Sequence, residues 1–194
     1  MAIAGGLKES ELLKQIKEIK RINKKFKNFR IFTSSEVDIL ADGSLDFSDK
    51  ILKKLDFATA SIHSGFKTKE KEMTARIIKA LENKYVKIFG HPTGRLINKR
   101  YPYEIDIEKI FEIAKEKNKF LEVNANPERL DLKDTYIKSA VENDVELVIG
   151  TDSHSIDNLK FMRYGVALTR RGWCDKKHIL NCLTLKEIKK KFNL

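Results

Sequence analysis

Strand-like runs of β-branched and aromatic residues alternate along this chain with amphipathic segments whose apolar residues recur every three or four positions. One run and one amphipathic segment follow each other roughly every 30 residues, which is typical of parallel βα units. The expected strands lie at 29–40, 57–63, 86–91, 120–124 and 146–151, and the expected helices at 9–26, 67–83, 106–117 and 132–143. We expect the remainder to be helical, with Thr184 and Glu187 forming a capping box at the start of the last helix. The sequence therefore predicts an α/β fold.

Length and charge distribution bound the class of the chain. Its 194 residues contain no linker and no shift in composition, so we expect one domain spanning 1–194. Charged side chains interrupt every apolar run before the ~18 residues that a membrane span needs, so we expect no membrane contact. The apolar start at 1–7 is too short for a secretory signal. Cys174 and Cys182 are expected to be free thiols in a reducing cytoplasm.

The net charge of +11 has two interpretations. Many lysines alternate with acidic residues on the expected helix faces, as at 14–21, and such residues usually form a solvated surface. A polyanionic partner such as DNA, RNA or a phosphorylated metabolite would account for the same excess. We expect no nucleic-acid motif and no basic patch interleaved with aromatic residues, so both interpretations stay open.

Side chains that bind metals collect where the expected strands end. Glu36 lies late in the first strand, His63 and His91 end or follow the second and third, and Asp152 and His154 follow the fifth. In parallel βα barrels, the carboxyl ends of the strands form the rim on which active sites are built. We therefore expect these five residues to lie at one rim.

The residue types at this rim favour divalent cations. Imidazole nitrogen and carboxylate oxygen are ligands that suit Zn²⁺ or Mn²⁺, with Mg²⁺ as a further candidate. Two such cations ~3.5–4 Å apart can clamp a phosphate and its attacking hydroxide. Taken singly, each histidine is as well explained by a structural hydrogen bond and each aspartate by a helix cap. Three of the four histidines in successive βα units favour a shared metal site.

Arginines near the expected rim have two interpretations. Arg95 follows the third strand and Arg129 follows the fourth. Because guanidinium groups bind phosphate in bidentate fashion, both are candidate phosphate-binding residues, and an ion pair with a nearby carboxylate is the alternative. For Arg76 we prefer the ion pair. His178 is expected at the surface, on a polar helix face.

Six segments of the chain resemble one known family. The most specific are GHPTGR at 90–95 and LEVNANPERLD at 121–131, and the others lie at 36–46, 61–64, 151–154 and 170–173. Together they resemble the PHP domain, named for polymerase and histidinol phosphatase. The resemblance covers nearly the whole chain and is closest to the C-terminal PHP domain of bacterial and archaeal family X DNA polymerases.

The resemblance implies a distorted, TIM-like barrel of seven βα strands with a trinuclear metal centre and phosphoester hydrolysis. It implies that Glu36 is a carboxylate bridging two metals and that His63 and His91 bind the second metal. It implies further that Asp152 binds the first metal and His154 the third. Glu36, Asp152 and His154 would then be catalytic as well as metal-binding.

The chain departs from the family pattern at its start. The family opens with two strands that carry His-x-His and Thr-Asp-His-Ser-like motifs, and neither motif is present. We therefore expect an incomplete, N-terminally truncated barrel of about five strands, with open edges on the first and the fifth. By the same pattern the Glu36, His63 and His91 set is complete, whereas the other two metal positions are depleted. Glu122 and Asn124 fall in the matching strand but are not expected ligands.

Three functions fit these expectations. The first is a metal-dependent phosphoesterase acting on DNA ends or abasic sites, as a 3′–5′ exonuclease, 3′-phosphatase or AP endonuclease, within a family X polymerase system for DNA repair. The second is a truncated module with weak catalysis and a binding or structural role. The third is a small-molecule phosphatase of the histidinol phosphatase type. The expected partners are DNA or a phosphorylated substrate, a polypeptide carrying the missing strands or a polymerase domain, and a second copy of the chain.

Overall fold

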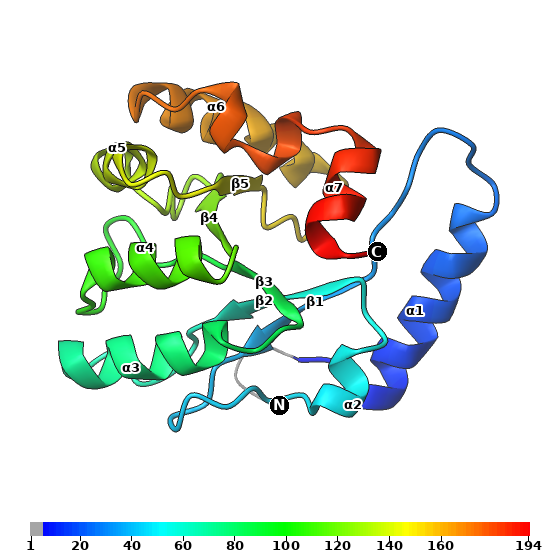
Figure 1. Ribbon diagram of the computed structural model, residues 1–194, viewed down its shortest axis with the longest axis horizontal. Helices are drawn as coiled ribbons and strands as arrows, with labels where there is room; N and C mark the ends of the chain where they lie inside the picture. The colour runs from blue at the N-terminus through cyan, green and yellow to red at the C-terminus, as the bar shows by residue number, and fades with distance from the viewer. Residues whose placement is uncertain (1–5) are drawn as a thin grey trace.

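A sheet of five parallel strands forms the centre of the computed structural model, which describes residues 6–194 (Figure 1). The strands lie side by side in chain order, β1 (Ser34–Asp38), β2 (Phe57–Ser61), β3 (Val86–Phe89), β4 (Phe120–Asn124) and β5 (Leu147–Gly150). Each connection therefore places the next strand on the same side of the previous one, as in a βα barrel. The predicted α/β class is confirmed, and the five strands are consistent with an incomplete TIM-like barrel. The chain start at 1–5, part of the segment in which we expect no secretory signal, lies outside the described residues.

Helices connect the strands, and the three that follow β2, β3 and β4 stack in the same order along one side of the sheet (Figure 1). The α-helices are α1 (Glu9–Asn23), α2 (Asp49–Leu52), α3 (Glu70–Leu81), α4 (Ile107–Glu116), α5 (Asp134–Glu142), α6 (Met162–Arg171) and α7 (Leu185–Phe192). Three short 3₁₀ helices, η1 (Ile156–Phe161), η2 (Lys176–His178) and η3 (Leu180–Cys182), lie in the last third of the chain. The predicted capping box opens α7, where the backbone and hydroxyl of Thr184 both donate to Glu187. No helix in the described part of the chain is long and apolar enough to cross a bilayer.

The core lies between the sheet and these helices. Leu121 and Val123 of β4 and Phe89 of β3 are fully buried, as are Ile110 and Phe111 of α4. Such nearly continuous apolar runs are typical of parallel strands that are covered on both faces. A smaller cluster, Ile88, Phe120, Leu180 and Phe192, packs α7 against the strands. The helices thus fix the strands rigidly and leave the loops at the carboxyl ends of the strands to form a site.

Several expected elements are shorter than predicted. The strand expected at 29–40 pairs only from Ser34 to Asp38, because its ladder with β2 begins at the pair Ser34–Phe57. The helix expected at 9–26 ends at Asn23, whose side-chain amide donates to the carbonyl of Ile31 and accepts from its N–H. In both cases a long-range contact ends an element that local periodicity would extend.

The two edges of the sheet differ. Along β5, Ile179 forms a parallel bridge with Leu147, and the Asn181 side chain both accepts from the N–H of Ile149 at 2.7 Å and donates to its carbonyl at 3.1 Å. The expectation of an open fifth strand is therefore wrong, because a turn near the C-terminus supplies its hydrogen bonds. The same turn buries His178 to 8% exposure, so its expected surface position is also wrong. Beyond β1, no further strand pairs within residues 6–194.

Candidate metal centre

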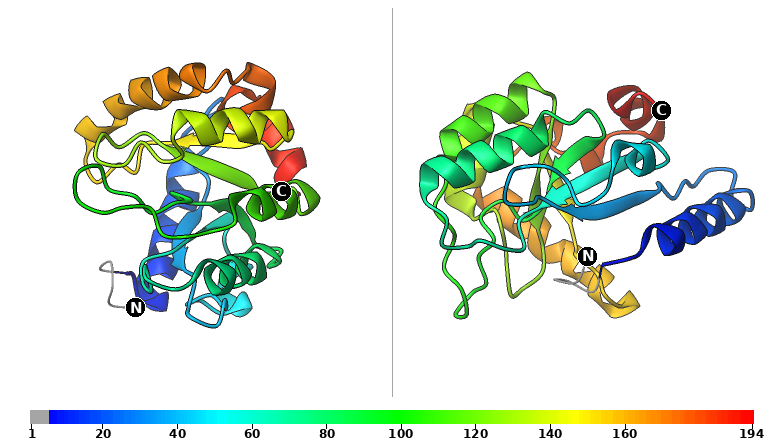
Figure 2. Two further views of the ribbon diagram at one scale, coloured as in Figure 1. Left: turned by 90° about the vertical axis from the view of Figure 1, so that its left-hand side faces the viewer. Right: turned by 90° about the horizontal axis from the view of Figure 1, so that it is seen from below.

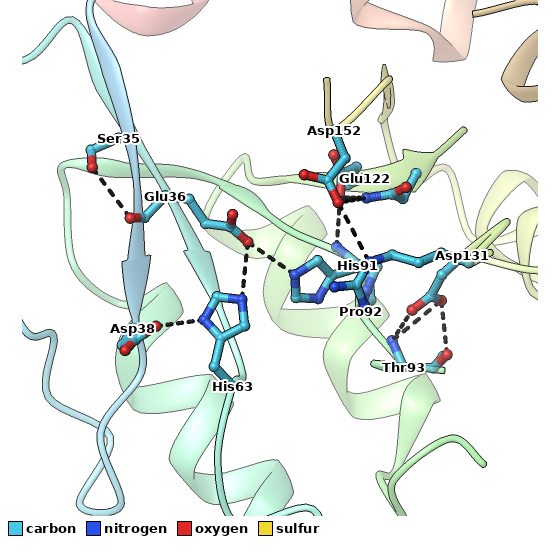
Figure 3. Close-up of polar contacts among 12 residues, drawn as sticks. Ser35, Glu36, Asp38, His63, His91, Pro92, Thr93, Glu122, Asp131 and Asp152 are labelled. Carbon is cyan, nitrogen blue, oxygen red and sulfur yellow. Dashed lines mark hydrogen bonds and ion pairs between the residues drawn. The ribbon is translucent and has the colours of Figure 1, made fainter. Parts of the chain in front are cut away.

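Three side chains from consecutive βα units meet at the carboxyl ends of their strands. Glu36 lies in β1, His63 follows β2 and His91 follows β3, and one ligand atom from each lies within 4.8 Å of the others (Figure 3). The Glu36 carboxylate is 2.9 Å from Nε2 of His91 and 3.4 Å from Nε2 of His63. The parallel register brings them together, because it sets Glu36 beside Thr59 and Ala60 beside Phe89.

Asp38 orients His63. Its carboxylate lies 2.5 Å from Nδ1 of His63. In the neutral tautomer that donates from Nδ1 to Asp38, the lone pair of Nε2 is free to bind a cation on the side of Glu36. Asp38 and Glu36 lie two residues apart on one strand and therefore project from the same face of β1. A carboxylate behind an imidazole is the arrangement that fixes metal-binding histidines in proteins. Our sequence analysis did not identify Asp38, although its spacing from Glu36 was a usable signal.

His91 is held from its backbone. Its N–H donates to Glu122 at 2.7 Å, its φ is +29°, and its side chain is only 3% exposed. The preceding residue, Gly90, lets the backbone pass close to Ser61, because a Cβ at position 90 would lie 2.4 Å from the Ser61 hydroxyl. The buried Nδ1 of His91 has no hydrogen-bond partner among the described residues. Nε2, and not this nitrogen, is the ring atom that faces Glu36.

Charges in this cluster are strongly coupled. Burial would raise the pKa of Glu36, but its hydrogen bonds with His63 and His91 outweigh burial and hold that pKa far below its usual range. The hydrogen bond to Glu36, supported by Asp38, raises the pKa of His63. Burial raises the pKa of Glu122 to about 7, against the opposing effect of His91. Glu36 is thus an anion at neutral pH, held beside the two imidazoles of His63 and His91.

A second group of polar side chains adjoins the triad. Glu122 of β4 accepts from Asn124 at 3.3 Å, and Asn124 also donates to Asp152 at 3.3 Å (Figure 3). Asp152 in turn pairs with Nε of Arg129 at 3.4 Å. Gly150 makes room for Glu122, since a Cβ on it would lie 2.1 Å from the Glu122 carboxylate. Asp152 therefore lies at the same rim as the triad but is not part of it. Hydrogen bonds through Asn124 and Glu122 connect Asp152 to the backbone of His91.

The remaining predicted residues lie differently. The His154 side chain is 82% exposed and its Nδ1 contacts the carbonyl of Asp152 at 2.9 Å, so the structure does not bring it into the triad. Arg95 donates to the carbonyls of Arg129 and Leu130. Metal binding by His154 and phosphate binding by Arg95 therefore stay predictions.

The ion pair expected for Arg76 is wrong. This guanidinium is buried and donates to the carbonyls of Ile39, Leu40 and Ser64, so it joins the loops after β1 and β2. Asp131 was not identified from the sequence either. It is fully buried and accepts from the backbone and hydroxyl of Thr93, which fixes the loop after β3. Sequence spacing gives no sign of these contacts, because they join residues 12 to 38 positions apart in the chain.

The donor set fits a divalent metal ion. One carboxylate and two imidazoles are ligands of borderline cations such as Zn²⁺ and Mn²⁺, and three protein ligands leave positions for water or substrate. The contact between Asp38 and Nδ1 of His63, which leaves Nε2 facing Glu36, supports the same conclusion. We therefore assign Glu36, His63 and His91 as the residues that would hold a metal.

Comparison with known proteins shows what the whole chain is similar to. No family model matches the chain. The chain is 46% identical to the DNA polymerase/3′-5′ exonuclease PolX of Bacillus subtilis (strain 168) over 188 residues, which are 97% of this chain and 33% of that relative. Together with the motifs GHPTGR and LEVNANPERLD, this similarity decides the assignment. The chain is a PHP-type domain related to family X polymerases.

Probable phosphatases are further relatives of this PHP-type domain. One from Thermoanaerobacter sp. (strain X514) is 35% identical over 146 residues, which cover 70% of the domain and 57% of that relative. Another from Clostridium acetobutylicum is 28% identical over 191 residues, 90% of the domain and 76% of that relative. The domain thus spans about a third of the polymerase and somewhat more than half of the first phosphatase.

Proposed function

We propose that this domain hydrolyses phosphoesters with a divalent metal and acts on DNA ends or abasic sites. The observation that carries the proposal is the Glu36, His63 and His91 triad at the carboxyl ends of three adjacent strands, with His63 fixed by Asp38. Similarity to a relative named as a polymerase and exonuclease, and to probable phosphatases, supports a hydrolase of this class.

Each residue at the rim has a role in this proposal. A bound Zn²⁺ or Mn²⁺ would supply a hydroxide near neutral pH and stabilise charge on phosphoryl oxygens. Glu36, His63 and His91 hold the cation, and Asp152 and His154 provide further ligands beside it. Arg129 binds the substrate phosphate, because its Nη1 is buried and has no partner within residues 6–194. Arg95 is the second predicted phosphate-binding residue, and its guanidinium also holds the carbonyls of Arg129 and Leu130.

DNA is the substrate class that we prefer. The net charge of +11 suits a polyanion, and the relative with 46% identity is named as a DNA polymerase/3′-5′ exonuclease. A small-molecule phosphomonoester is the second candidate, favoured by the names of the probable phosphatases. We further propose a cytoplasmic role in DNA repair alongside a polymerase polypeptide.

Release of phosphate from a 3′-phosphorylated oligonucleotide tests the proposal. We expect slow hydrolysis that requires Mn²⁺ or Zn²⁺ and is lost in Asp152→Ala. Arg129→Lys should lower kcat/KM about tenfold, because lysine cannot replace a forked guanidinium, while the matched surface variant Arg171→Lys should be unchanged. Hydrolysis without metal, or equal rates in wild type and Asp152→Ala, would refute the proposal. A kcat/KM higher for histidinol phosphate than for the oligonucleotide would favour the second candidate.

A further inference from the structure

The segment between α1 and β1 is a loop with a closed base. Asn23 at the end of α1 exchanges two hydrogen bonds of 2.8 Å with the backbone of Ile31. Next to this clamp, Arg30 pairs with Asp56 at 3.4 Å, and Asp56 accepts from the backbone and hydroxyl of Thr33. The intervening residues, Lys24-Lys25-Phe26-Lys27-Asn28-Phe29, are all exposed. The clamp therefore holds a projecting loop in a defined place.

Two aromatic rings stand at the tip of this loop without packing on the core. Phe26 is 47% exposed and Phe29 is 60% exposed. Their ring centroids are 5.4 Å apart with an interplanar angle of 72°, so the rings meet edge to face. This geometry leaves at least one face of each ring uncovered by the other. Neither ring belongs to the hydrophobic clusters of the described chain.

Unpaired lysines flank the two rings in the sequence. Lys24, Lys25 and Lys27 are exposed, and none has an ion pair within 4.0 Å among residues 6–194. Lys20 adds to this charge in the last turn of α1, whereas Arg21 in the same turn pairs with Glu18. The expectation that the chain has no basic patch interleaved with aromatic residues is therefore wrong. We call residues 24–30 the basic loop.

We propose that the basic loop is a binding site for single-stranded nucleic acid, separate from the metal centre. Proteins that bind single strands without sequence preference combine aromatic stacking surfaces with lysines that contact the backbone phosphates. The basic loop leads into the amino end of β1, whereas the metal centre lies at the carboxyl ends of the strands (Figure 1). Figure 2 shows in its right-hand view that α1 and this loop lie on the far side of the molecule from α3 and α4.

A membrane surface fits the loop less well. Amphipathic helices bind lipid with a free apolar face, but the apolar residues Leu12 and Ile16 of α1 are buried against the protein. Only the two phenylalanine rings remain for insertion. Their uncovered faces and the three lysines match stacked bases and phosphates, so a single strand is the occupant that the geometry favours.

Fluorescence anisotropy of a labelled oligothymidine tests the aromatic part. The assay uses the full chain in EDTA, so that neither metal binding nor hydrolysis contributes and a failure of the proposed hydrolysis leaves the result intact. Phe26→Ala/Phe29→Ala should weaken binding about fivefold or more, as loss of base stacking does. Phe26→Leu/Phe29→Leu should weaken it similarly, whereas Phe26→Trp/Phe29→Trp should retain it. The matched control Tyr101→Ala/Trp173→Ala removes two other exposed rings, 94% and 78% exposed, and should leave the affinity unchanged.

The salt dependence tests the lysines. Lys24→Gln/Lys25→Gln/Lys27→Gln should reduce the slope of log K against log salt by about 2, at roughly 0.7 per phosphate contact. A control with the same loss of charge, Lys176→Gln/Lys177→Gln/Lys186→Gln, should change the slope much less. The proposal would be overturned if the variants of the basic loop and their matched controls changed the affinity and the salt slope equally. A second result would also overturn it: the phenylalanine variants keep the oligonucleotide affinity of wild type but no longer bind vesicles of anionic phosphatidylglycerol.

Discussion

The ability of the triad to bind a metal depends on one further residue, Asp38, which contacts His63. Glu36, His63 and His91 all carry donor atoms, but only His63 has a carboxylate on its far nitrogen. That carboxylate, from Asp38, decides which ring nitrogen is free for a cation. Because this contact joins only the end of β1 to the residue after β2, we expect that it can be removed without unfolding the chain.

Asp38→Asn should weaken metal binding about tenfold or more without unfolding the domain. The amide keeps the size of the side chain but removes the negative charge that holds the proton on Nδ1 of His63. Competition with a chromogenic chelator measures the affinity, and Asp175→Asn, an exposed aspartate outside the site, is the control. Equal affinities in both variants would show that Asp38 has no role in binding.

Lys119 is a buried charge that predicts a pH-dependent stability. It is 5% exposed and donates to the carbonyls of Asn83 and Val86 at 2.9 and 2.7 Å, and burial lowers its pKa to about 8. Because the unfolded chain keeps this proton to a pH near 10.5, folding is favoured increasingly as pH rises from about 8 to 10.5. Wild type should therefore gain up to about 3 kcal/mol over Lys119→Met across this range.

Urea unfolding in EDTA at several pH values checks this gain. Parallel stability curves for wild type and Lys119→Met would contradict the lowered pKa.

At the scale of elements, the β5 edge shows how a short turn replaces a strand. Ile179 bridges to Leu147, and Asn181 satisfies both backbone groups of Ile149. An edge with open hydrogen-bonding groups would attract other strands, so this turn protects the sheet on that side. Its sequence carries no strand pattern, which is why local periodicity does not predict the pairing.

Asn181→Leu should destabilise the domain by about 1–3 kcal/mol, because the N–H and carbonyl of Ile149 lose their partners. Hydrogen exchange of the Ile149 amide should accelerate more than that of Leu121 in the sheet centre. Asn181→Asp keeps an acceptor for the N–H but loses the donor, so its effect should be intermediate. Unchanged exchange at Ile149 in Asn181→Leu would show that the side chain does not protect the edge.

For the whole molecule, the sequence predicted the architecture better than the contacts. Alternating periodicities indicate the parallel α/β order, and histidines at strand ends indicate the rim, because both patterns are local. The register that sets Glu36 beside Thr59 is a long-range property, as are the burial of Arg76 and the contact of Asp131 with Thr93. Such contacts join loops far apart in the chain, so periodicity and strand-end position give no sign of them.

The triad also couples the site to the fold. Its three residues come from β1 and the loops after β2 and β3, so a bound cation would tie three strands together at one end. Binding to the folded state alone adds about 2.7 kcal/mol at a ligand concentration 100 times Kd. Thermal unfolding should therefore shift upwards with metal, and the shift should vanish in His91→Ala.

Metal content after dialysis tests the central claim most directly. We expect one tightly held equivalent of Zn²⁺ or Mn²⁺ per chain, because Glu36, His63 and His91 form the one cluster of three ligand residues within residues 6–194. His91→Ala should remove this equivalent, since a site with three protein ligands cannot spare one, while His154→Ala should retain it. An equivalent retained in His91→Ala, no tight binding in wild type, or three tight equivalents per chain would contradict the account.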